Sequence, residues 1–316
     1  MPLSWVYGWL VKKRFELYFP VPMAKPVICV GNLVTGGAGK TPLVMSLIDE
    51  MKKKGHNPHI LTLGYGGEEI GPVQVSSDRD TSRYVGDEAL LLVDKAPTWV
   101  SKNRPLGAQI AMDSGADIVV MDDGFQNPII FKDFSIIVID GKVGFGNKNL
   151  MPAGPLREPI GQGINRAQAL VIIGDDMLNI EEKIRRTDPD IMILRASIKP
   201  CDSNINVKDK KLAAFAGIGR PEKFKESLED AGAEVVLWKS FGDHYEFKED
   251  DLLPIIKEAE AKDLTLITTA KDFVRIPEAL QGKIEIFKIE LEWHDNGCDK
   301  VISVIEKVIS DRAENI

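Results

Sequence analysis

The chain has 316 residues, 44% of them hydrophobic and 28% charged, and its formal net charge is -8. This length and apolar content are typical of a soluble globular protein that can bury two hydrophobic cores. The acidic balance argues against a general nucleic-acid binder, whose phosphate contacts need a basic face. The three cysteines, Cys29, Cys201 and Cys298, lie too far apart for a metal-binding motif and fit a reducing cytoplasm.

The amino end is rich in aromatic and basic side chains. Trp5, Tyr7 and Trp9 precede the cluster Lys12-Lys13-Arg14. Aromatic rings favour the headgroup level of a bilayer, and a basic cluster would meet anionic lipid. The apolar run is shorter than the roughly 20 residues of a spanning helix, and it lacks a small-residue cleavage site. We expect an amphipathic helix over residues 1–20 that lies at a membrane interface, packs on the protein's own core, or does both.

A glycine-rich turn follows the apolar run at residues 27–31. It consists of Gly36, Gly37, Ala38, Gly39, Lys40 and Thr41. In such a loop, backbone N–H groups surround phosphate oxygens, Lys40 reaches the β and γ phosphates, and the Thr41 hydroxyl ligates Mg²⁺. The helix expected at residues 42–54 adds its positive dipole end. Val34 stands where the strict motif has its first glycine, so the sequence predicts a variant phosphate loop for a nucleoside triphosphate.

Strand-like and helix-like segments alternate after this loop, which predicts βαβ units. We expect strands at 58–63, 116–123, 134–140 and 169–174, and helices at 87–94 and 106–114. The strands have the continuous Val/Ile character of strands covered on both faces, which favours a mostly parallel sheet. Ligands of such sheets bind at the carboxyl ends of the strands.

The strand expected at residues 116–123 ends in Asp122 and Asp123. An apolar strand that ends in acidic residues is how phosphate-loop enzymes place a carboxylate beside Mg²⁺. Two adjacent aspartates could instead be solvated turn residues, but the phosphate loop favours a place for both on the metal side. Gln126 supplies a polar side chain near the same edge.

A second α/β unit is expected from Lys211 onward. Its predicted helices lie at 222–231 and 250–261, its strands at 234–238 and 264–269, and a last helix at 299–312. Residues 191–198 are interpreted as an extended linker, and 199–204 as a turn or boundary. The predicted fold is α/β. A P-loop NTPase-like, mostly parallel sheet forms a kinase domain at 21–198, and residues 199–316 form a smaller α/β domain.

Other polar residues carry little weight individually. Asp87 could be a helix cap, Arg104 a surface charge and His244 an ordinary loop histidine. Their order along the chain is more informative than any one of them.

Taken in order, these pieces resemble the tetraacyldisaccharide 4'-kinase family over nearly the whole chain. The most specific match is Leu-Met-Pro-Ala-Gly-Pro-Leu-Arg-Glu-Pro at 150–159. Further matching stretches lie at 2–8, 30–33, 36–42, 64–67, 86–88, 102–104, 122–126, 144–147, 215–219, 241–244 and 271–272. The family's loop also tolerates a non-glycine at the position of Val34.

The resemblance implies an ATP-dependent kinase that phosphorylates the 4' hydroxyl of the tetraacyldisaccharide 1-phosphate precursor of lipid A. The family works at the cytoplasmic face of the bacterial inner membrane, as a peripheral enzyme whose partners are the acylated glucosamine disaccharide and the membrane surface. It implies neither a nucleic-acid partner nor a protein partner. A membrane-docked amino end would let the sugar reach the active site while the acyl chains stay in the bilayer.

The resemblance also assigns roles to residues. Asp87 is the general base on the 4' hydroxyl, and His244 pairs with it and raises its basicity. Arg104 and Gln126 are further contacts in the nucleotide site. As expected above, the resemblance implies that the glycine-rich loop binds ATP. It also implies that Thr41, Asp122 and Asp123 bind Mg²⁺.

The chain departs from the family's usual pattern at three places: Thr62-Leu63 replaces Ser-Arg, Asn127 replaces His, and Ala270 replaces Glu. None of them touches the residues with assigned roles, so we expect an active but divergent kinase. A binding protein that has lost its chemistry is the alternative that these departures raise.

A membrane-associated nucleotide-switch ATPase or GTPase is the rival from another class. A GTPase is expected to carry a guanine-specific Asn-Lys-x-Asp, and the nearest stretch, Asn147-Lys-Asn-Leu150, fails at its last position. A kinase needs an acceptor-side base, and it turns over little nucleotide without its acceptor.

Overall fold

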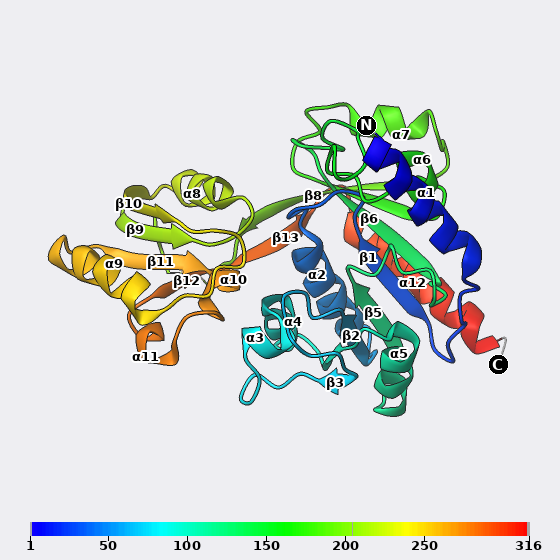
Figure 1. Ribbon diagram of the computed structural model, residues 1–316, viewed down its shortest axis with the longest axis horizontal. Helices are drawn as coiled ribbons and strands as arrows, with labels where there is room; N and C mark the ends of the chain where they lie inside the picture. Colours follow the sequence, from blue (N-terminus) through cyan, green and yellow to red (C-terminus); the bar gives the residue numbers. More distant parts are fainter. Residues whose placement is uncertain (1, 204, 315–316) are drawn as a thin grey trace.

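The computed structural model describes residues 2–203 and 205–314 and contains two β-sheets in two lobes (Figure 1). The larger sheet has nine strands in the order β13-β8-β7-β6-β1-β5-β2-β4-β3, and the smaller has four in the order β10-β9-β11-β12. We call residues 2–200 and 289–314 the large lobe, and residues 205–287 the small lobe.

The nine-stranded sheet is mostly parallel, as predicted. Its strands are β1 (Val27–Gly31), β2 (Pro58–Thr62), β3 (Val73–Gln74), β4 (Thr98–Val100), β5 (Ile118–Asp122), β6 (Phe134–Asp140), β7 (Ala169–Ile173), β8 (Met192–Pro200) and β13 (Ile289–Trp293). The exceptions are its two edge pairs, β3 with β4 and β13 with β8, which are antiparallel. Strand β1 lies between β5 and β6, so the phosphate loop leaves the middle of the sheet.

Both faces of this sheet are buried. The helices of the large lobe are α1 (Pro2–Leu17), α2 (Lys40–Lys53), α3 (Ser82–Val85), α4 (Asp87–Leu92), α5 (Arg104–Asp113), α6 (Ile160–Ile164), α7 (Ile180–Arg185) and α12 (Gly297–Glu314). Side chains of α2 and α12 pack with Ile28 and Val30 on one face. Side chains of α5, α6 and α7 pack with Val27 and Cys29 on the other. The alternation along β1 is the reason that its sequence is apolar throughout.

The small lobe is the second α/β unit that the sequence predicts. Its parallel strands are β9 (Lys211–Ala216), β10 (Glu234–Ser240), β11 (Thr265–Thr269) and β12 (Glu285–Phe287), and its helices are α8 (Pro221–Asp230), α9 (Glu249–Ala261), α10 (Ala270–Phe273) and α11 (Glu278–Gln281). Separate apolar clusters lie on the two faces of this sheet and form the second core.

The predicted boundary between the lobes is wrong in two places. Residues 191–198, expected as a linker, lie mostly in β8, which pairs with β7 in the large sheet. The last part of the chain, expected in the smaller domain, returns to the large lobe, because β13 pairs with β8 and α12 packs against the large sheet. Trp293 fixes this return, since its indole Nε1 donates to Ser46 Oγ over 2.8 Å. The predicted segments 1–20 and 199–316 include residues 1, 204, 315 and 316, which lie outside the described residues.

Two chain segments therefore connect the lobes side by side. Strands β8 and β13 run together from the large sheet toward the small lobe (Figure 1). The ladder continues just beyond them, where the Cys201 backbone N–H donates to the Lys288 carbonyl over 3.0 Å. The small lobe is thus an insertion between two paired strands of the large sheet.

Candidate active site

The phosphate loop adopts the strand–loop–helix arrangement that the sequence predicts, between β1 and α2. Gly36 and Gly39 have φ values of 109° and 92°, in the left-handed region that favours glycine. A Cβ atom at Gly36 or Gly37 would meet no atom within 4 Å, whereas one at Gly39 would lie 2.5 Å from Ile173 Cδ1. The middle of the loop is therefore open to a ligand, while its end is packed tightly on β7.

Lys40 and Asp123 face each other beside this loop. Lys40 Nζ lies 3.6 Å from Asp123 Oδ2. Arg157 Nη1 donates to both oxygens of Asp123, at 2.7 Å and 3.0 Å. Burial acts to raise the pKa of Asp123, but the charges of Lys40 and Arg157 hold it below its ordinary value. Asp123 is therefore an ionised carboxylate that holds two cations next to the loop.

Asp122 has a different environment although it is the adjacent residue. It is fully buried at the end of β5, and neither of its carboxylate oxygens accepts a hydrogen bond within the described residues. Burial raises the pKa of Asp122 to about 7, and the nearby charge of Glu88 adds to this effect. A buried carboxylate without a partner carries a desolvation cost that a bound cation would remove.

The donor set fits Mg²⁺ better than a metal held wholly by protein. In the described residues, no group of three or more His, Cys, Asp or Glu side chains forms a ligand cluster. Mg²⁺ commonly takes one or two carboxylates and completes its shell with water and substrate phosphates. The unpartnered carboxylate of Asp122, at the open phosphate loop, satisfies that pattern.

Arg104 begins α5 and turns toward the same region. Arg104 is only 3% exposed, and its Nη1 atom makes no hydrogen bond within the described residues. Burial lowers its pKa, and the charges of Asp122 and Asp123 oppose that shift. Arg104 thus offers a buried, unsatisfied donor close to both aspartates.

Gln126 joins the start of the loop to the 150–159 stretch. Its Nε2 donates to the Asn32 carbonyl over 2.8 Å and to Glu158 Oε1 over 3.0 Å. Its Oε1 accepts from Arg157 Nη1 over 3.4 Å. The sequence marks this stretch as specific but assigns no role to Arg157 or Glu158. The structure places both beside the phosphate loop.

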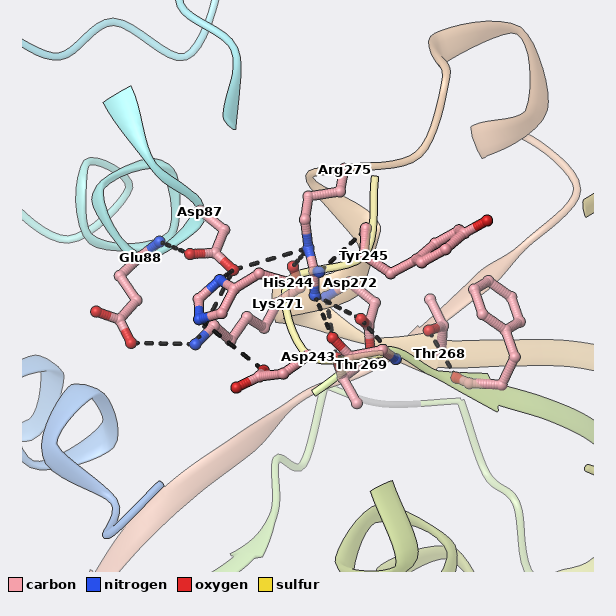
Figure 2. A network of polar contacts seen from close by, with 12 residues as sticks. Asp87, Glu88, Asp243, His244, Tyr245, Thr268, Thr269, Lys271, Asp272 and Arg275 are labelled. Atoms are coloured by element: carbon pink, nitrogen blue, oxygen red, sulfur yellow. Dashed lines mark hydrogen bonds and ion pairs between the residues drawn. The ribbon is translucent and has the colours of Figure 1, made fainter. Parts of the chain in front are cut away.

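Asp87 and His244 meet across the two lobes. Asp87 begins α4 in the large lobe, and His244 lies in the loop after β10 in the small lobe; His244 Nδ1 lies 3.1 Å from Asp87 Oδ2 (Figure 2). Lys271 Nζ and Arg275 Nε, both from the small lobe, lie 3.9 Å and 3.7 Å from the same oxygen. Three basic side chains of the small lobe, those of His244, Lys271 and Arg275, therefore meet the large lobe at the Asp87 carboxylate.

The electrostatics of this pair correct one prediction. Burial acts to raise the pKa of Asp87, but the contact with His244 and the charges of Lys271 and Arg275 hold it below its ordinary value. The same contact raises the pKa of His244, although burial opposes this. The expectation that His244 raises the basicity of Asp87 is therefore wrong, because basic groups beside a carboxylate stabilise its ionised form. Of the two groups, the imidazole gains basicity.

A buried network fixes the loop that carries His244. Arg275 Nη2 donates to Asp272 Oδ1 over 2.6 Å and to the Gly217 carbonyl over 3.1 Å, and its Nη1 donates to the Tyr245 carbonyl over 3.0 Å (Figure 2). The His244 backbone N–H donates to the Gly217 carbonyl over 3.1 Å. Sequence reasoning missed the role of Arg275, and only the match at 271–272 pointed to this segment.

Close packing at Gly86 holds the backbone that carries Asp87. Gly86, directly before Asp87, has a φ of 87°, and a Cβ atom there would lie 2.6 Å from the Tyr65 carbonyl oxygen. The stretch at 64–67 therefore packs directly on the backbone that leads into α4. The Tyr65 ring also lies 5.3 Å from the His244 ring.

The three departures from the family pattern have local roles. The Thr62 carbonyl accepts from the Ser101 backbone N–H over 3.1 Å, and Asn127 Oδ1 accepts from the Ile129 backbone N–H over 2.9 Å. Ala270 opens α10 directly after Thr269, whose side chain caps that helix by accepting from the Asp272 backbone N–H. The conformations of these segments thus do not depend on the usual residues.

Comparison with known proteins gives a consistent picture. The model of the family Tetraacyldisaccharide-1-P 4'-kinase matches residues 1–308. The chain belongs to this family. The Tetraacyldisaccharide 4'-kinase of Paramagnetospirillum magneticum is 48% identical over 292 residues, which cover 92% of this chain and 89% of that relative. The same enzyme of Gluconobacter oxydans is 42% identical over 295 residues, covering 93% and 89%.

A solved structure of this kinase family agrees with the fold. The crystal structure of LpxK from Aquifex aeolicus in complex with ATP matches with a TM-score of 0.75 and 25% identity, and the match covers 98% of each chain. The predicted family and the predicted P-loop NTPase-like α/β fold are thereby confirmed.

Proposed function

We propose that this chain transfers the γ-phosphate of ATP to the 4' hydroxyl of tetraacyldisaccharide 1-phosphate, the activity that names its family. The observation that carries the proposal is that α4, which begins with Asp87, packs against α2, which begins with Lys40 of the phosphate loop. Glu88, the neighbour of Asp87, is close enough to Asp122 to raise the pKa of Asp122. An acid–base pair on the acceptor side and a phosphate site on the donor side are what a kinase needs.

The phosphate loop holds the donor. Backbone N–H groups of residues 36–39 and the amino end of α2 bind the phosphates, and Lys40 reaches the β and γ groups. Asp123 keeps Lys40 and Arg157 beside the loop, so both cations face the developing negative charge. Arg104, whose buried Nη1 lacks a partner, is a further phosphate contact, and Gln126 fixes the loop's first residues.

Thr41 and Asp122 hold Mg²⁺ in this proposal. A Mg²⁺ ion held by these two residues would supply positive charge that offsets the negative charge of the phosphate groups. Asp123 was expected on the metal side as well, but both its oxygens already accept from Arg157. We therefore assign Asp122 as the carboxylate ligand and give Asp123 the role of orienting cations.

Asp87 and His244 act together on the acceptor. The 4' hydroxyl donates to the dyad, and the proton that leaves it is shared by a carboxylate and an imidazole of raised pKa. Asp87 accepts the hydrogen bond from the hydroxyl, and the His244 imidazole can take the proton when it is neutral, which requires a pH above its raised pKa. Because phosphoryl transfer has a loose transition state, the proton moves late and a strong base is unnecessary.

The amino-terminal helix presents its apolar side chains outward. Trp5 is 81% exposed and Trp9 is 58% exposed, whereas Ser4 is buried and Tyr7 donates its hydroxyl to the Arg157 carbonyl over 3.1 Å. Helix α1 thus holds Ser4 and Tyr7 against the protein and leaves Trp5 and Trp9 exposed. Its apolar and polar residues are spread around the helix and do not form the two opposite faces of the expected amphipathic helix. Within the described part of the chain, no helix has both the length and the apolar content to cross a bilayer.

We assign α1 to the membrane interface at the cytoplasmic face of the inner membrane, where exposed Trp and nearby Lys and Arg side chains bind lipid. A cavity of about 680 Å³ lies between α1 and residues 148–159, and it gives an acylated substrate a path from that interface. Helix α1 also contacts Arg157, whose side chain binds Asp123 beside the phosphate loop.

Phosphate transfer from ATP to tetraacyldisaccharide 1-phosphate in mixed detergent micelles tests the function. The natural chain should transfer phosphate only when the acceptor is present, Asp87→Ala should not, and Asp94→Ala, which removes an exposed carboxylate just beyond α4, should behave as the natural chain does. ATP hydrolysis that ignores the acceptor would instead favour a nucleotide switch.

Liposome flotation tests the membrane assignment. Trp5→Ser combined with Trp9→Ser should abolish binding to anionic liposomes without unfolding the protein, because both side chains are exposed. Val236→Ser removes an exposed apolar residue from the small lobe and should leave binding unchanged. Equal binding by the double variant and the natural chain would refute the assignment.

A further inference from the structure

A second contact between the lobes lies at the phosphate loop itself. Arg220, in the small lobe just before α8, donates from Nη2 to the Gly37 carbonyl over 2.6 Å and to Asp140 Oδ2 over 2.7 Å. Gly37 lies in the open middle of the loop, and Asp140 ends β6 next to β1. This contact is separate from the Asp87–His244 pair and involves different elements of both lobes.

Asp140 is firmly held at this contact. Its Oδ1 accepts from the backbone N–H groups of Lys142 and Val143, at 3.0 Å and 3.2 Å. Its Oδ2 accepts from Arg220 and also from Lys223 Nζ, over 3.1 Å. Burial acts to raise the pKa of Asp140, but the contacts with Arg220 and Lys223 hold it below its ordinary value. Asp140 is thus a fixed, charged anchor for the Arg220 guanidinium.

Most of the hydrogen-bonding capacity of Arg220 is unused. Both of its contacts use Nη2, and within residues 2–203 and 205–314 neither Nε nor Nη1 makes a hydrogen bond. The side chain is 39% exposed, so a ligand can reach it. A guanidinium carries five donors in a planar fork that matches phosphate oxygens. Here that fork stands beside Gly36 and Gly37, where the phosphate loop is open.

We propose that Arg220 is a phosphate-binding residue that the small lobe contributes to the nucleotide site, where its free donors bind the terminal phosphate of ATP. The terminal group is the expected target because Arg220 comes from the lobe that also carries His244, which is the acceptor side. Asp140 and the Gly37 carbonyl fix the guanidinium, and the γ-phosphate completes its hydrogen bonds. The proposal rests on the proposed function for the identity of the nucleotide.

A consequence is that the binding of ATP affects the position of the small lobe. Once the γ-phosphate binds Arg220, the small lobe gains a contact with the large lobe that ADP cannot supply. That contact favours the lobe position in which His244 meets Asp87. Arg220 therefore both binds the transferred group and positions the dyad for it.

Calorimetric titration of ATP and ADP, with Mg²⁺ and without lipid, tests this role. Arg220→Ala should weaken ATP binding roughly tenfold to 100-fold, the range for hydrogen bonds to charged groups, and should weaken ADP binding less than about threefold. Lys223→Ala is the matched control, because it removes a cation from Asp140 without touching the loop, and it should leave both affinities within about twofold.

Two outcomes overturn the proposal: Arg220→Ala binds ATP as tightly as the natural chain, or it weakens ATP and ADP equally, as a purely structural contact would. If Arg220→Ala does not fold, Arg220→Gln retains a polar side chain without the charge and is held to the same criteria. Because no acceptor is used, failure of lipid phosphorylation by the natural chain would overturn the proposed function alone. Even then, loss of the preference for ATP over ADP in Arg220→Ala would support the phosphate-binding role of Arg220.

Discussion

The phosphate loop and the Asp87–His244 dyad are built in opposite ways. The loop belongs to one lobe, where residues that are neighbours in sequence connect β1 to α2. The dyad exists only because an insertion in the large sheet folds back and delivers His244, Lys271 and Arg275 to Asp87. A site of the first kind depends on local backbone geometry, whereas one of the second kind depends on how two lobes meet. Nucleotide binding and chemistry should therefore separate when residues are changed.

The largest effect is expected at the loop. Lys40→Ala removes the cation expected to reach the β and γ phosphates, and an arginine finger, which stabilises the same charge in other phosphoryl-transfer enzymes, contributes roughly 10³ to 10⁵ to kcat. ATP affinity and transfer should both fall, as measured by calorimetry and by phosphorylation of the lipid acceptor. Transfer that persists within about tenfold of the natural rate would show that another cation, such as Arg157, fills this role.

The next effect separates the two regions. Asp87→Ala should reduce kcat by roughly 10² to 10⁴, the contribution of a positioned acid or base, while the affinity for ATP stays nearly unchanged. The comparison uses single-turnover transfer together with calorimetry, and Asp94→Ala serves as the control. If the affinity for ATP falls as far as kcat does, Asp87 is part of the nucleotide site and not the acceptor side.

His244→Ala should cost less than Asp87→Ala, at the lower end of the same range or about 10² in kcat. The reason is that Asp87 can still accept a hydrogen bond from the 4' hydroxyl and keeps Lys271 and Arg275 nearby. Single-turnover rates of the two variants under identical conditions give the order. The reverse order would make His244 the group that contacts the hydroxyl.

The smallest effect is on stability and depends on pH. Because the contact with Asp87 raises the pKa of His244, its contribution is full below the ordinary histidine value of about 6.5 and is lost as the pH rises through the higher value in the folded protein. The carboxylate, whose pKa is lowered, contributes above about 3.9 and loses its effect as the pH falls through its value in the folded protein.

The natural chain should therefore be more stable than His244→Gln by about 1 kcal/mol at pH 6, and the difference should shrink at pH 9. Denaturant unfolding at the two pH values measures it. A difference that is the same at both values would mean that His244 is uncharged in the folded protein.

The same contrast explains how far the sequence could be used for prediction. The strand, the glycines and Lys40 are contiguous, so their geometry follows from a local pattern, and the structure has the loop where it was expected. The pairing of Asp87 with His244 came from the family resemblance, since no spacing rule connects two residues in different lobes. Arg275 and Asp272 form a buried ion pair that has no sequence signature, because their hydrogen bonds are made with the backbone of Gly217.

The return of the chain to the large sheet could not be predicted for a related reason. Strand β13 is a short edge strand whose sequence alternates apolar and charged residues, and its partner β8 precedes the whole small lobe. Alternation predicts a strand but not its neighbour, because edge pairing is decided by packing such as the contact between Trp293 and Ser46. Arg220 was also missed, since it lies just beyond the family match at residues 215–219.

The buried, unpartnered carboxylate of Asp122 has a consequence for the stability of the protein when no nucleotide is bound. Unfolding would return this group to water, so the buried carboxylate lowers the free energy of unfolding at neutral pH when no cation is bound. A ligand that binds only the folded chain raises that free energy in proportion to the logarithm of its concentration. Mg²⁺ together with ATP should thus act as a folding ligand, and the kinase should resist heat and proteases better in a cell rich in ATP than in a starved one.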